Sequence, residues 1–296
     1  MTAAPANGIT IEYDVHGDDD APALLLVMGL GGQLVGWPDE FVEQLAAAGP
    51  YRVIRYDNRD VGLSTHDEHE PPTTREVLLS LVSRRAAHPA YVLKDMAADG
   101  IGLLDHLGVA RAHVVGISMG GMIAQTMAIE HPGRVASLTS IMSNTGDRKH
   151  GKVHRRILRQ VPKLLKRTPG EDEVERGVEM FRLISGPHFD EEAQRTMTKA
   201  ALARSNDVDG TSRQMMAIAG SPDRTAALGR VRVPTLVVHG LLDPLVKPDG
   251  GITTALAVPG ARLVMFPDMA HDLPRARWDE LFAEIVATTR RADGTR

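Results

Sequence analysis

The chain has 296 residues and a formal net charge of −4, with 43% hydrophobic and 24% charged residues. This composition is ordinary for a globular protein that needs no disulfides, and its acidic balance argues against nucleic acid as a partner. The absence of cysteine excludes disulfides, thiolate zinc sites and a cysteine nucleophile. Neither a signal peptide nor an apolar run of about 20 residues is visible, so we expect a soluble cytoplasmic protein.

Short apolar runs alternate with helix-like segments along most of the chain. The expected strands are 9–15, 23–28, 52–56, 112–117, 135–142, 234–239 and 261–266, and the expected helices are 38–48, 91–107, 119–130 and 275–289. Several of these strands are apolar at nearly every position, as is typical of parallel strands that are covered on both faces. The pattern predicts an α/β fold with an open, mostly parallel twisted sheet and helices on both of its faces.

This alternation stops between residues 144 and 223, where helix-like segments with polar connections replace strands. Because the stretch is too long for a loop of a compact domain, we expect a helical cap over 144–223, inserted into a core of 1–143 and 224–296. Four of its methionines could line an adaptable pocket or fill a core: Met180, Met197, Met215 and Met216.

A basic stretch without acidic residues, 148–167, opens this segment. It is interrupted by Pro162, and its apolar side chains recur at helical spacing: Val153, Ile157, Val161, Leu164 and Leu165. Such a stretch could face anionic lipid or an acidic substrate. We favour a cap helix whose apolar stripe packs on the core while its charges are solvated.

The segment Gly116–Gly120 fits the pattern G-x-S-x-G and stands between an expected strand and an expected helix. This setting is required for a nucleophile elbow, a strained turn that presents a serine at the start of a helix. We therefore expect Ser118 to be a nucleophile, and the backbone N–H of Met119 to donate a hydrogen bond to an oxyanion.

A second oxyanion donor is expected from the glycine-rich loop after strand 23–28. The Leu30 N–H is the first candidate and the Gly29 N–H the second. Farther along, Asp57 and Arg59 follow another strand. We assign them a structural role, in which they pair with backbone and charge in a tight turn near the elbow.

A serine hydroxyl needs a base, and His271 is the one histidine of twelve that stands in a loop after a strand and before the last helix. His113 and His239 lie on expected strands, which favours either packing or the support of a catalytic residue. Asp243 follows strand 234–239 and completes the chain order Ser, Asp, His that α/β-hydrolases have. Asp147 is a weaker candidate for the acid, while Asp268 and Asp272 are too close to His271 in sequence.

Several strings resemble the aclacinomycin methylesterase branch of the α/β-hydrolases, and bacterial esterases named as lipases look similar. They include V-M-G-L-G-G-Q, R-Y-D-N-R-D-V-G-L-S, V-V-G-I-S-M-G-G, V-V-H-G-L-L-D-P and M-A-H-D-L-P. The resemblance covers 21–143 and 231–271 and is weak through 144–223. It implies a carboxylic-ester hydrolase with a helical cap, a triad of Ser118, Asp243 and His271, and Leu30 and Met119 as oxyanion donors. Met28-Gly29 stands where many hydrolases have His-Gly, a departure that is shared with this branch.

The function expected from these motifs is hydrolysis of a small to medium apolar ester through an acyl-enzyme, with no metal or organic cofactor. Three alternatives stay open. One is a cofactor-free haloperoxidase (perhydrolase) or a carbon–carbon bond hydrolase on the same triad. Another is a lipase at a membrane surface, and the least favoured is a ligand-binding protein without catalysis. The oligomeric state is not indicated by the sequence.

Overall fold

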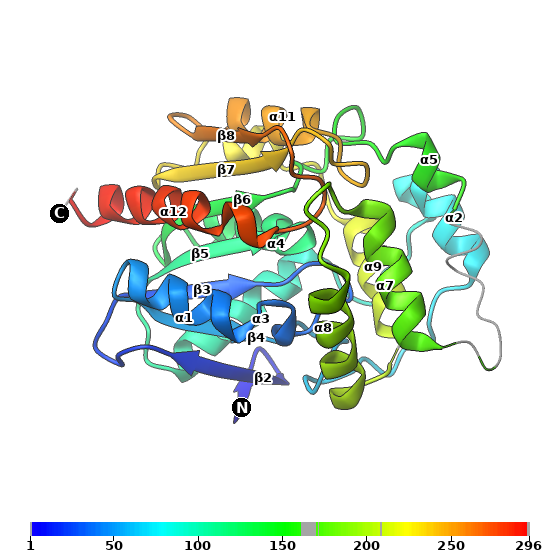
Figure 1. Ribbon diagram of the computed structural model, residues 1–296, viewed down its shortest axis with the longest axis horizontal. Helices are drawn as coiled ribbons and strands as arrows, with labels where there is room; N and C mark the ends of the chain where they lie inside the picture. The colour runs from blue at the N-terminus through cyan, green and yellow to red at the C-terminus, as the bar shows by residue number, and fades with distance from the viewer. Residues whose placement is uncertain (1, 161–169, 171, 208, 295–296) are drawn as a thin grey trace.

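A computed structural model describes residues 2–160, 170, 172–207 and 209–294. Its centre is one open sheet of eight strands in the order β1-β2-β4-β3-β5-β6-β7-β8 (Figure 1). The first two pairings, β1 with β2 and β2 with β4, are antiparallel and the other five are parallel. The strands are β1 Thr2–Ala6, β2 Ile9–His16, β3 Ala23–Val27, β4 Arg52–Tyr56, β5 Ala112–Ile117, β6 Val135–Ile141, β7 Thr235–Gly240 and β8 Arg262–Phe266.

All seven expected strands are present, with ends that differ by at most one residue, but β1 was not anticipated. Its sequence, T-A-A-P-A, has Thr2 as its one residue of high β-propensity, and Pro5 is tolerated because β1 is an edge strand. Asn7 and Gly8 both have positive φ and join β1 to β2 in a two-residue hairpin. An Asn-Gly pair is the usual sequence mark of this turn, so the hairpin was detectable.

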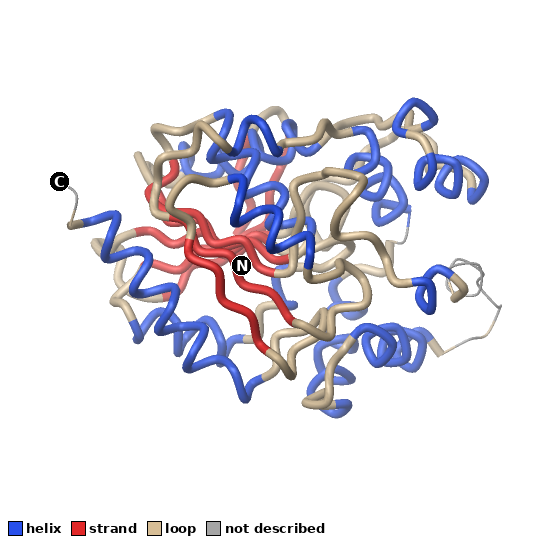
Figure 2. The backbone as a smooth tube through the Cα atoms, turned by 90° about the horizontal axis from the view of Figure 1, so that it is seen from above, coloured by secondary structure: helices blue, strands red, loops and turns tan. Residues whose placement is uncertain are grey.

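Helices cover both faces of the sheet, as expected, and Figure 2 shows the strands as a central layer between them. One apolar cluster packs α1 (Asp39–Ala48) and α12 (Trp278–Asp293) on one face. The other cluster packs α3 (Leu93–His106) and α4 (Met119–Glu130) on the opposite face, where α11 (Asp249–Ala257) covers β7 and β8. Strands β6 and β7 are buried at every position.

The strand order reverses at β3. The chain passes from β3 through α1 to β4 on one side, and then crosses back through α3 to β5 on the other side. The loops that leave the carboxyl ends of β3 and β5 therefore diverge toward opposite faces of the sheet. A crevice forms at such a point, and open α/β sheets bind their ligands there.

Between β6 and β7 the described chain is helical, as expected. It contains α5 (Arg155–Leu158), α7 (Glu173–Ile184), α8 (Glu191–Arg204) and α9 (Asp209–Gly220), and a short α10 (Thr225–Leu228) precedes β7. In Figure 1 these helices, except α10, lie beyond the carboxyl ends of the parallel strands. They are joined there by α2 (Thr74–Val82), which packs against α9 although it comes from a different part of the chain.

Neither α2 nor α11 was expected. The start of α2 carries a capping box, in which Thr73 and Glu76 bond each other's backbone N–H groups, and its T-x-x-E pattern was visible in the sequence. Short 3₁₀ turns at Leu34–Gly36, Arg84–Ala86 and Arg275–Arg277 complete the secondary structure. No helix in the described ranges is both long enough and apolar enough to cross a membrane.

The basic stretch 148–167 is described only as far as residue 160. There Ile157 is buried and Arg155 and Arg156 are exposed, as expected, but the helix is confined to α5, and Val153 lies before it and is only half-buried. Val161, Pro162, Leu164 and Leu165 lie outside the described residues, so the expectation for them stays a prediction.

Candidate active site

Ser118 lies at the junction of β5 and α4 with a left-handed backbone, φ 54° and ψ −118°. A non-glycine residue adopts such a conformation only under strain, which is common at catalytic turns. The flanking glycines make the turn possible. A Cβ on Gly116 would lie 2.1 Å from the Gly120 oxygen, and a Cβ on Gly120 would lie 2.0 Å from the Val27 oxygen.

Three side chains that the sequence singled out form a continuous hydrogen-bonded chain. His271 Nε2 is 3.0 Å from Ser118 Oγ, and His271 Nδ1 is 2.7 Å from Asp243 Oδ2. His271 and Asp243 are buried, whereas Ser118 is partly exposed. Gly240, at the end of β7, lets the histidine loop approach, because a Cβ there would meet the Met269 oxygen at 2.1 Å.

Asp243 is held at both carboxylate oxygens. Oδ1 accepts the backbone N–H groups of Leu245 and Val246, each at 2.8 Å, and Oδ2 faces the His271 ring. Burial opposes ionisation of this carboxyl, but the charge of His271 and the hydrogen bonds from His239 and His271 outweigh it and lower its pKa to about 2. Asp243 is therefore an anion throughout the neutral range.

His239 on β7 is fully buried and contacts the acid, so of the two roles expected for it the supporting one applies. Its Nε2 lies 2.8 Å from the Val246 carbonyl oxygen and 3.4 Å from Asp243 Oδ2. Because both neighbours are acceptors, Nε2 must carry the proton. The second imidazole thus supports the same carboxylate oxygen, Oδ2, that faces His271.

The glycine-rich loop after β3 runs directly beside the serine. A Cβ on Gly29 would lie 3.2 Å from Ser118 Cβ, so the loop packs closely against the serine. Met119 is the first residue of α4, so its N–H has no partner in the helix. Neither it nor the Leu30 N–H donates to any acceptor among the described residues. Both N–H groups are thus free to donate: Met119 directly follows Ser118 in the chain, and Leu30 directly follows Gly29, which lies against Ser118.

The structural role expected for Asp57 and Arg59 is confirmed. Asp57 is fully buried and accepts the N–H groups of Leu34 and Leu63, and it pairs with Arg204 of α8. Arg59 forms a two-bond ion pair with Asp99 of α3, at 2.6 Å for each bond. These groups bind the turn to its surroundings and do not contact Ser118.

The weaker candidate for the acid, Asp147, contacts Lys149 N–H and the His150 ring instead of His271. Asp268 pairs with Arg277 and His188, and the carboxylate of Asp272 accepts the N–H groups of Gly186 and Ala270. Asp243 is the carboxylate that the fold brings to the histidine.

A cavity of about 730 Å³ opens beside the serine, between the strand ends and helices α7 and α8. His271 and Ile117 line its floor, and the side chains over it are largely apolar: Trp37, Met180, Phe181, Phe189, Met197 and Leu202. Met180 and Met197 thus line the cavity, whereas Met216 is buried in the core. Lining of a pocket therefore applies to Met180 and Met197, and filling of the core applies to Met216.

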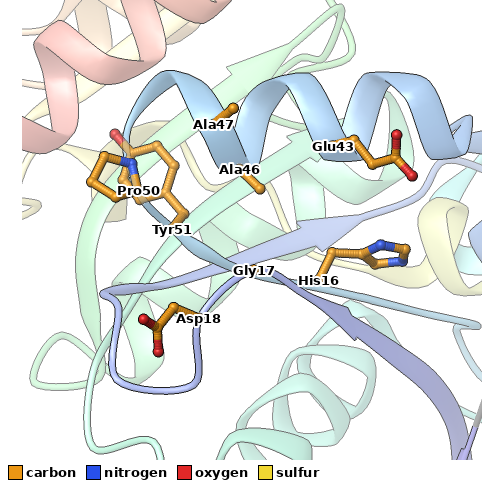
Figure 3. A pocket seen from close by; sticks show the side chains of 8 residues that line it. All are labelled: His16, Gly17, Asp18, Glu43, Ala46, Ala47, Pro50 and Tyr51. Carbon is orange, nitrogen blue, oxygen red and sulfur yellow. The ribbon is translucent and has the colours of Figure 1, made fainter.

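A second hollow of about 450 Å³ lies where β2 ends and β4 begins, at the sheet edge opposite Ser118 (Figure 3). Its wall is formed by Ala46, Ala47 and Pro50, and Tyr51 bonds the Thr289 hydroxyl. Within the described residues, no group of three or more potential metal ligands occurs here or elsewhere.

Two amide side chains beside the glycine-rich loop were not anticipated. Asn58 donates to the Met28 carbonyl, and Gln214 of α9 accepts the Gly31 N–H. Asn58 stands in a string that the sequence did single out, between Asp57 and Arg59. Gln214 lies in a helix without any motif, so no sequence pattern pointed to it.

Comparisons with known proteins agree with this architecture. A family model described as alpha/beta hydrolase fold matches residues 22–274. Rhodomycin D methylesterase DauP from Streptomyces sp. (strain C5) is 33% identical over 96% of each chain, which confirms the resemblance to the methylesterase branch. A 2-hydroxy-6-oxononadienedioate/2-hydroxy-6-oxononatrienedioate hydrolase from Burkholderia vietnamiensis is 28% identical over 93% of this chain and 90% of its own length.

Among solved structures, the enol-lactonase from Burkholderia xenovorans LB400 superimposes with a TM-score of 0.74, at 24% identity, over 97% of this chain and 99% of its own. That likeness concerns the fold. Together with the family model and the methylesterase, it confirms the expected fold class. The chain therefore belongs to the α/β-hydrolase fold family of enzymes.

Proposed function

We propose that this protein is a carboxylic-ester hydrolase in which Ser118 is the nucleophile, His271 the base and Asp243 the acid that orients the base. The observation that carries this proposal is the chain of hydrogen bonds from Asp243 through His271 to Ser118 Oγ. It ends on a serine that is held at a helix start, next to the unpaired N–H group of Met119. This combination of roles defines a serine hydrolase site on any fold.

The reaction proceeds in two acyl-transfer steps. His271 Nε2 accepts the proton of Ser118 as Oγ attacks the ester carbonyl, and Asp243 stabilises the resulting imidazolium. The N–H groups of Met119 and Leu30, or Gly29 in place of Leu30, hold the oxyanion. The alcohol leaves with the proton from His271, and water activated by the same ring then releases the acid from Ser118.

The substrate in this proposal is a small to medium ester with an apolar body. A cavity of about 730 Å³ with methionine and aromatic walls is in the range that holds a drug-sized apolar molecule. The methylesterase relatives, which are named for rhodomycin D, favour an ester with a small alcohol and a bulky acid. We propose that residues 144–223 form a cap that supplies one wall of this cavity, over a core of 1–143 and 224–296.

A second candidate is carbon–carbon bond hydrolysis on the same triad. It is favoured by the relative that is named as a hydrolase of 2-hydroxy-6-oxononadienedioate. That name describes a dicarboxylate with a ketone and no ester group, so its hydrolysis must break a carbon–carbon bond. A haloperoxidase (perhydrolase), a lipase at a membrane surface and a non-catalytic binder rank lower. The unpaired donors beside an activated serine favour catalysis over binding alone. A cytoplasmic location stays a prediction.

The test is hydrolysis of p-nitrophenyl esters of increasing acyl length and of bulky methyl esters, by the wild type and by Ser118→Ala. We expect turnover by the wild type and a loss of about 10⁴- to 10⁶-fold in kcat for the variant. Ser143→Ala is a matched control, because Ser143 is a buried serine near the same helix that bonds neither His271 nor Asp243.

Wild type that is folded yet inactive on every ester, but cleaves a 2-hydroxy-6-oxo-dienoate, would favour the second candidate. Ester turnover that survives in Ser118→Ala would contradict the proposed nucleophile.

A further inference from the structure

Gln214 of α9 spans two loops of the core. Its side chain is fully buried. Oε1 accepts the Gly31 N–H at 2.8 Å, and Nε2 donates to the Arg59 carbonyl at 2.7 Å. Both polar ends of the amide are therefore used, one on the glycine-rich loop and one on the turn after β4. A buried amide with partners at both ends fixes the distance between the two backbones that it joins.

Gly31 follows Leu30, whose N–H is a proposed oxyanion donor. On the other side of Leu30 the loop is held by Asn58, which donates to the Met28 carbonyl at 3.0 Å. The peptide group that carries the Leu30 N–H is thus bracketed by two side-chain amides. The loop also packs tightly on α9, because a Cβ on Gly31 would lie 2.8 Å from Thr211 Oγ1.

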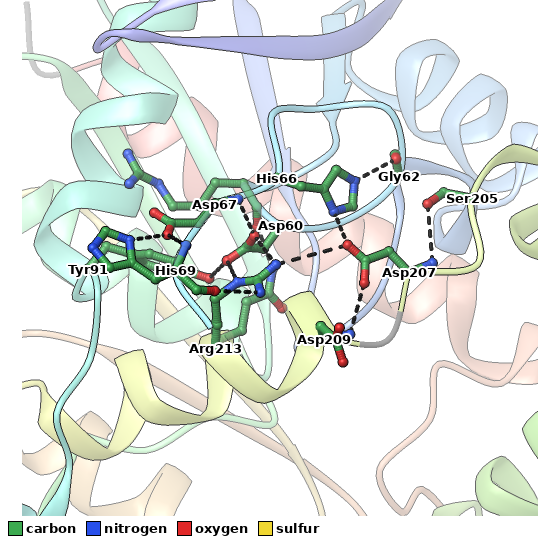
Figure 4. Close-up of polar contacts among 12 residues, drawn as sticks. Asp60, Gly62, His66, Asp67, His69, Tyr91, Ser205, Asp207, Asp209 and Arg213 are labelled. Carbon is green, nitrogen blue, oxygen red and sulfur yellow. Dashed lines mark hydrogen bonds and ion pairs between the residues drawn. The ribbon is translucent and has the colours of Figure 1, made fainter. Parts of the chain in front are cut away.

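Helix α9 is itself anchored to the core at the residue before Gln214. Arg213 makes two hydrogen bonds to Asp60, at 3.1 and 2.9 Å, and Asp60 also accepts from the Tyr91 hydroxyl (Figure 4). Arg213 further donates to the His69 carbonyl. The position of Gln214 relative to the sheet is therefore fixed by a buried ion pair and not by packing alone.

We propose that Gln214 is a positioning residue for oxyanion stabilisation: it reaches from the helical segment 144–223 and holds the Gly31 N–H so that the Leu30 N–H faces Ser118. This inference rests on the proposed function. It means that the segment that walls the cavity also completes the catalytic geometry. Gln214 touches no reacting atom and acts through the loop.

The first test is Gln214→Met, which keeps the length of the side chain and removes both hydrogen bonds. We expect kcat on a p-nitrophenyl ester to fall about 10- to 100-fold, less than the loss of a whole oxyanion donor, with KM changed less than about 3-fold. Gln125→Met is the matched control. Gln125 is an equally buried glutamine with two side-chain partners, Ser140 and Arg224, and it should lower the melting temperature without lowering kcat.

A second readout separates positioning from general damage. An alkyl boronic acid forms a tetrahedral adduct on the serine and places an oxygen where the oxyanion would lie. Gln214→Met should bind it about 10-fold or more weakly, while its affinity for the product alcohol stays within about 2-fold of the wild type. A merely structural role would lower the melting temperature and leave both affinities unchanged.

Gln214→Glu is the milder variant. In its neutral form the new carboxyl has the same donor and acceptor as the amide, whereas the ionised form would face the Arg59 carbonyl. The guanidinium groups of Arg59, whose carbonyl Gln214 contacts, and of the adjacent Arg213 are already paired with Asp99 and Asp60. The ratio of its kcat to that of the wild type should therefore be highest at the lowest pH at which the wild type works, and should fall as the carboxyl ionises.

The outcomes are distinguishable. Wild-type kcat and boronate affinity in Gln214→Met, with Ser118→Ala inactive, would overturn this inference alone. Full ester turnover by Ser118→Ala would overturn the proposed function as well.

Discussion

Helices α4 and α8 are of similar length but are held in the molecule in different ways. Helix α4, which begins directly after the proposed nucleophile, Ser118, buries ten of its twelve residues, whereas α8, which walls the cavity, buries one of fourteen, Gln194. Helix α8 is instead joined to the core at its last residue, Arg204, through Asp57, and α9 through Arg213 and Gln214. Ser118 thus stands at the start of a densely packed helix, whereas helices α8 and α9 are attached to the core by a few directional polar bonds.

This difference has a consequence for substitutions. Apolar burial is spread over many neighbouring side chains, so a change at the elbow disturbs the core and the chemistry together. A polar attachment depends on single groups, and losing one of them leaves a buried partner unsatisfied. Changes in the helical segment should therefore separate stability, substrate affinity and catalysis more cleanly than changes in the core.

The largest effect is expected at the acid. Asp243→Asn keeps the shape of the side chain but removes the charge that orients and stabilises the His271 ring, and kcat should fall about 10⁴-fold, equivalent to about 5.5 kcal/mol. Steady-state ester hydrolysis measures this. Asp147→Asn is the control, since that carboxylate contacts His150, and a comparable loss in this variant would contradict the choice of Asp243.

The pH dependence gives a second check on the same residue. The pKa of Asp243 is lowered to about 2, below that of an unfolded aspartate at about 3.9. Its ionisation therefore stabilises the fold fully above about pH 4, and this contribution is lost as the pH falls through about 2. Because Asp243 is already ionised above about pH 4, its titration does not contribute to the fall of kcat/KM with pH in that range. Replacing His239, which also faces Asp243, by Gln should therefore leave the pH profile of kcat/KM above about pH 4 unchanged.

The next effect tests the packed part of the comparison. Gly120→Ala would place a Cβ 2.0 Å from the Val27 oxygen, so β3 and α4 would have to separate. We expect a loss of about 4 kcal/mol in the free energy of unfolding, within the range of severe core overpacking. Denaturant titration measures it. Gly133→Ala is the matched control, because nothing lies within 4 Å of its added Cβ, and it should change stability by less than about 0.5 kcal/mol.

The polar attachment is tested by Arg213→Met. The change leaves Asp60, which is fully buried, without its ion-pair partner, and a broken buried pair typically costs about 3 kcal/mol or more. If the comparison is right, the variant also loses kcat, because α9 carries Gln214. Arg195→Met removes ion pairs to Glu175 and Glu191 that are open to solvent, and should change neither quantity measurably.

The site was more predictable than the region around it because its determinants are local. The strand, the turn Gly116–Gly120 and the helix that follow one another in sequence also form the elbow in space. Asp243 and His271 follow directly after strands, and parallel strands deliver their carboxyl ends to one edge. Each assignment therefore needed only a strand and the residues after it.

The long-range hydrogen bonds and ion pairs that hold the loops around the site could not be predicted in this way. Gln214 bonds Gly31 across 183 residues, and Arg204 bonds Asp57 across 147. Long-range polar pairs leave no periodicity in either partner. Helix α8 buries only Gln194, and the five buried residues of α9 include the polar Arg213 and Gln214, so neither helix shows a clear apolar stripe. The α2 helix and the β1–β2 hairpin are different, since the capping box and the Asn7-Gly8 turn were readable.

The smallest effect concerns substrate affinity alone. Met197 lines the cavity from α8, and Met197→Ala removes part of an apolar wall without touching a bond that joins the segment to the core. At about 25 cal/mol per Å² of apolar surface that the substrate no longer buries, KM for a bulky ester should rise about 5-fold, with kcat and KM for an acetate ester unchanged. Met215→Ala on α9, outside the cavity lining, should leave KM as it is. A fall in kcat with Met197→Ala would instead mean that α8, like α9, helps to position the catalytic loops. Helix α8 would then belong with the catalytic part of the molecule, and the contrast with α4 would be wrong for it.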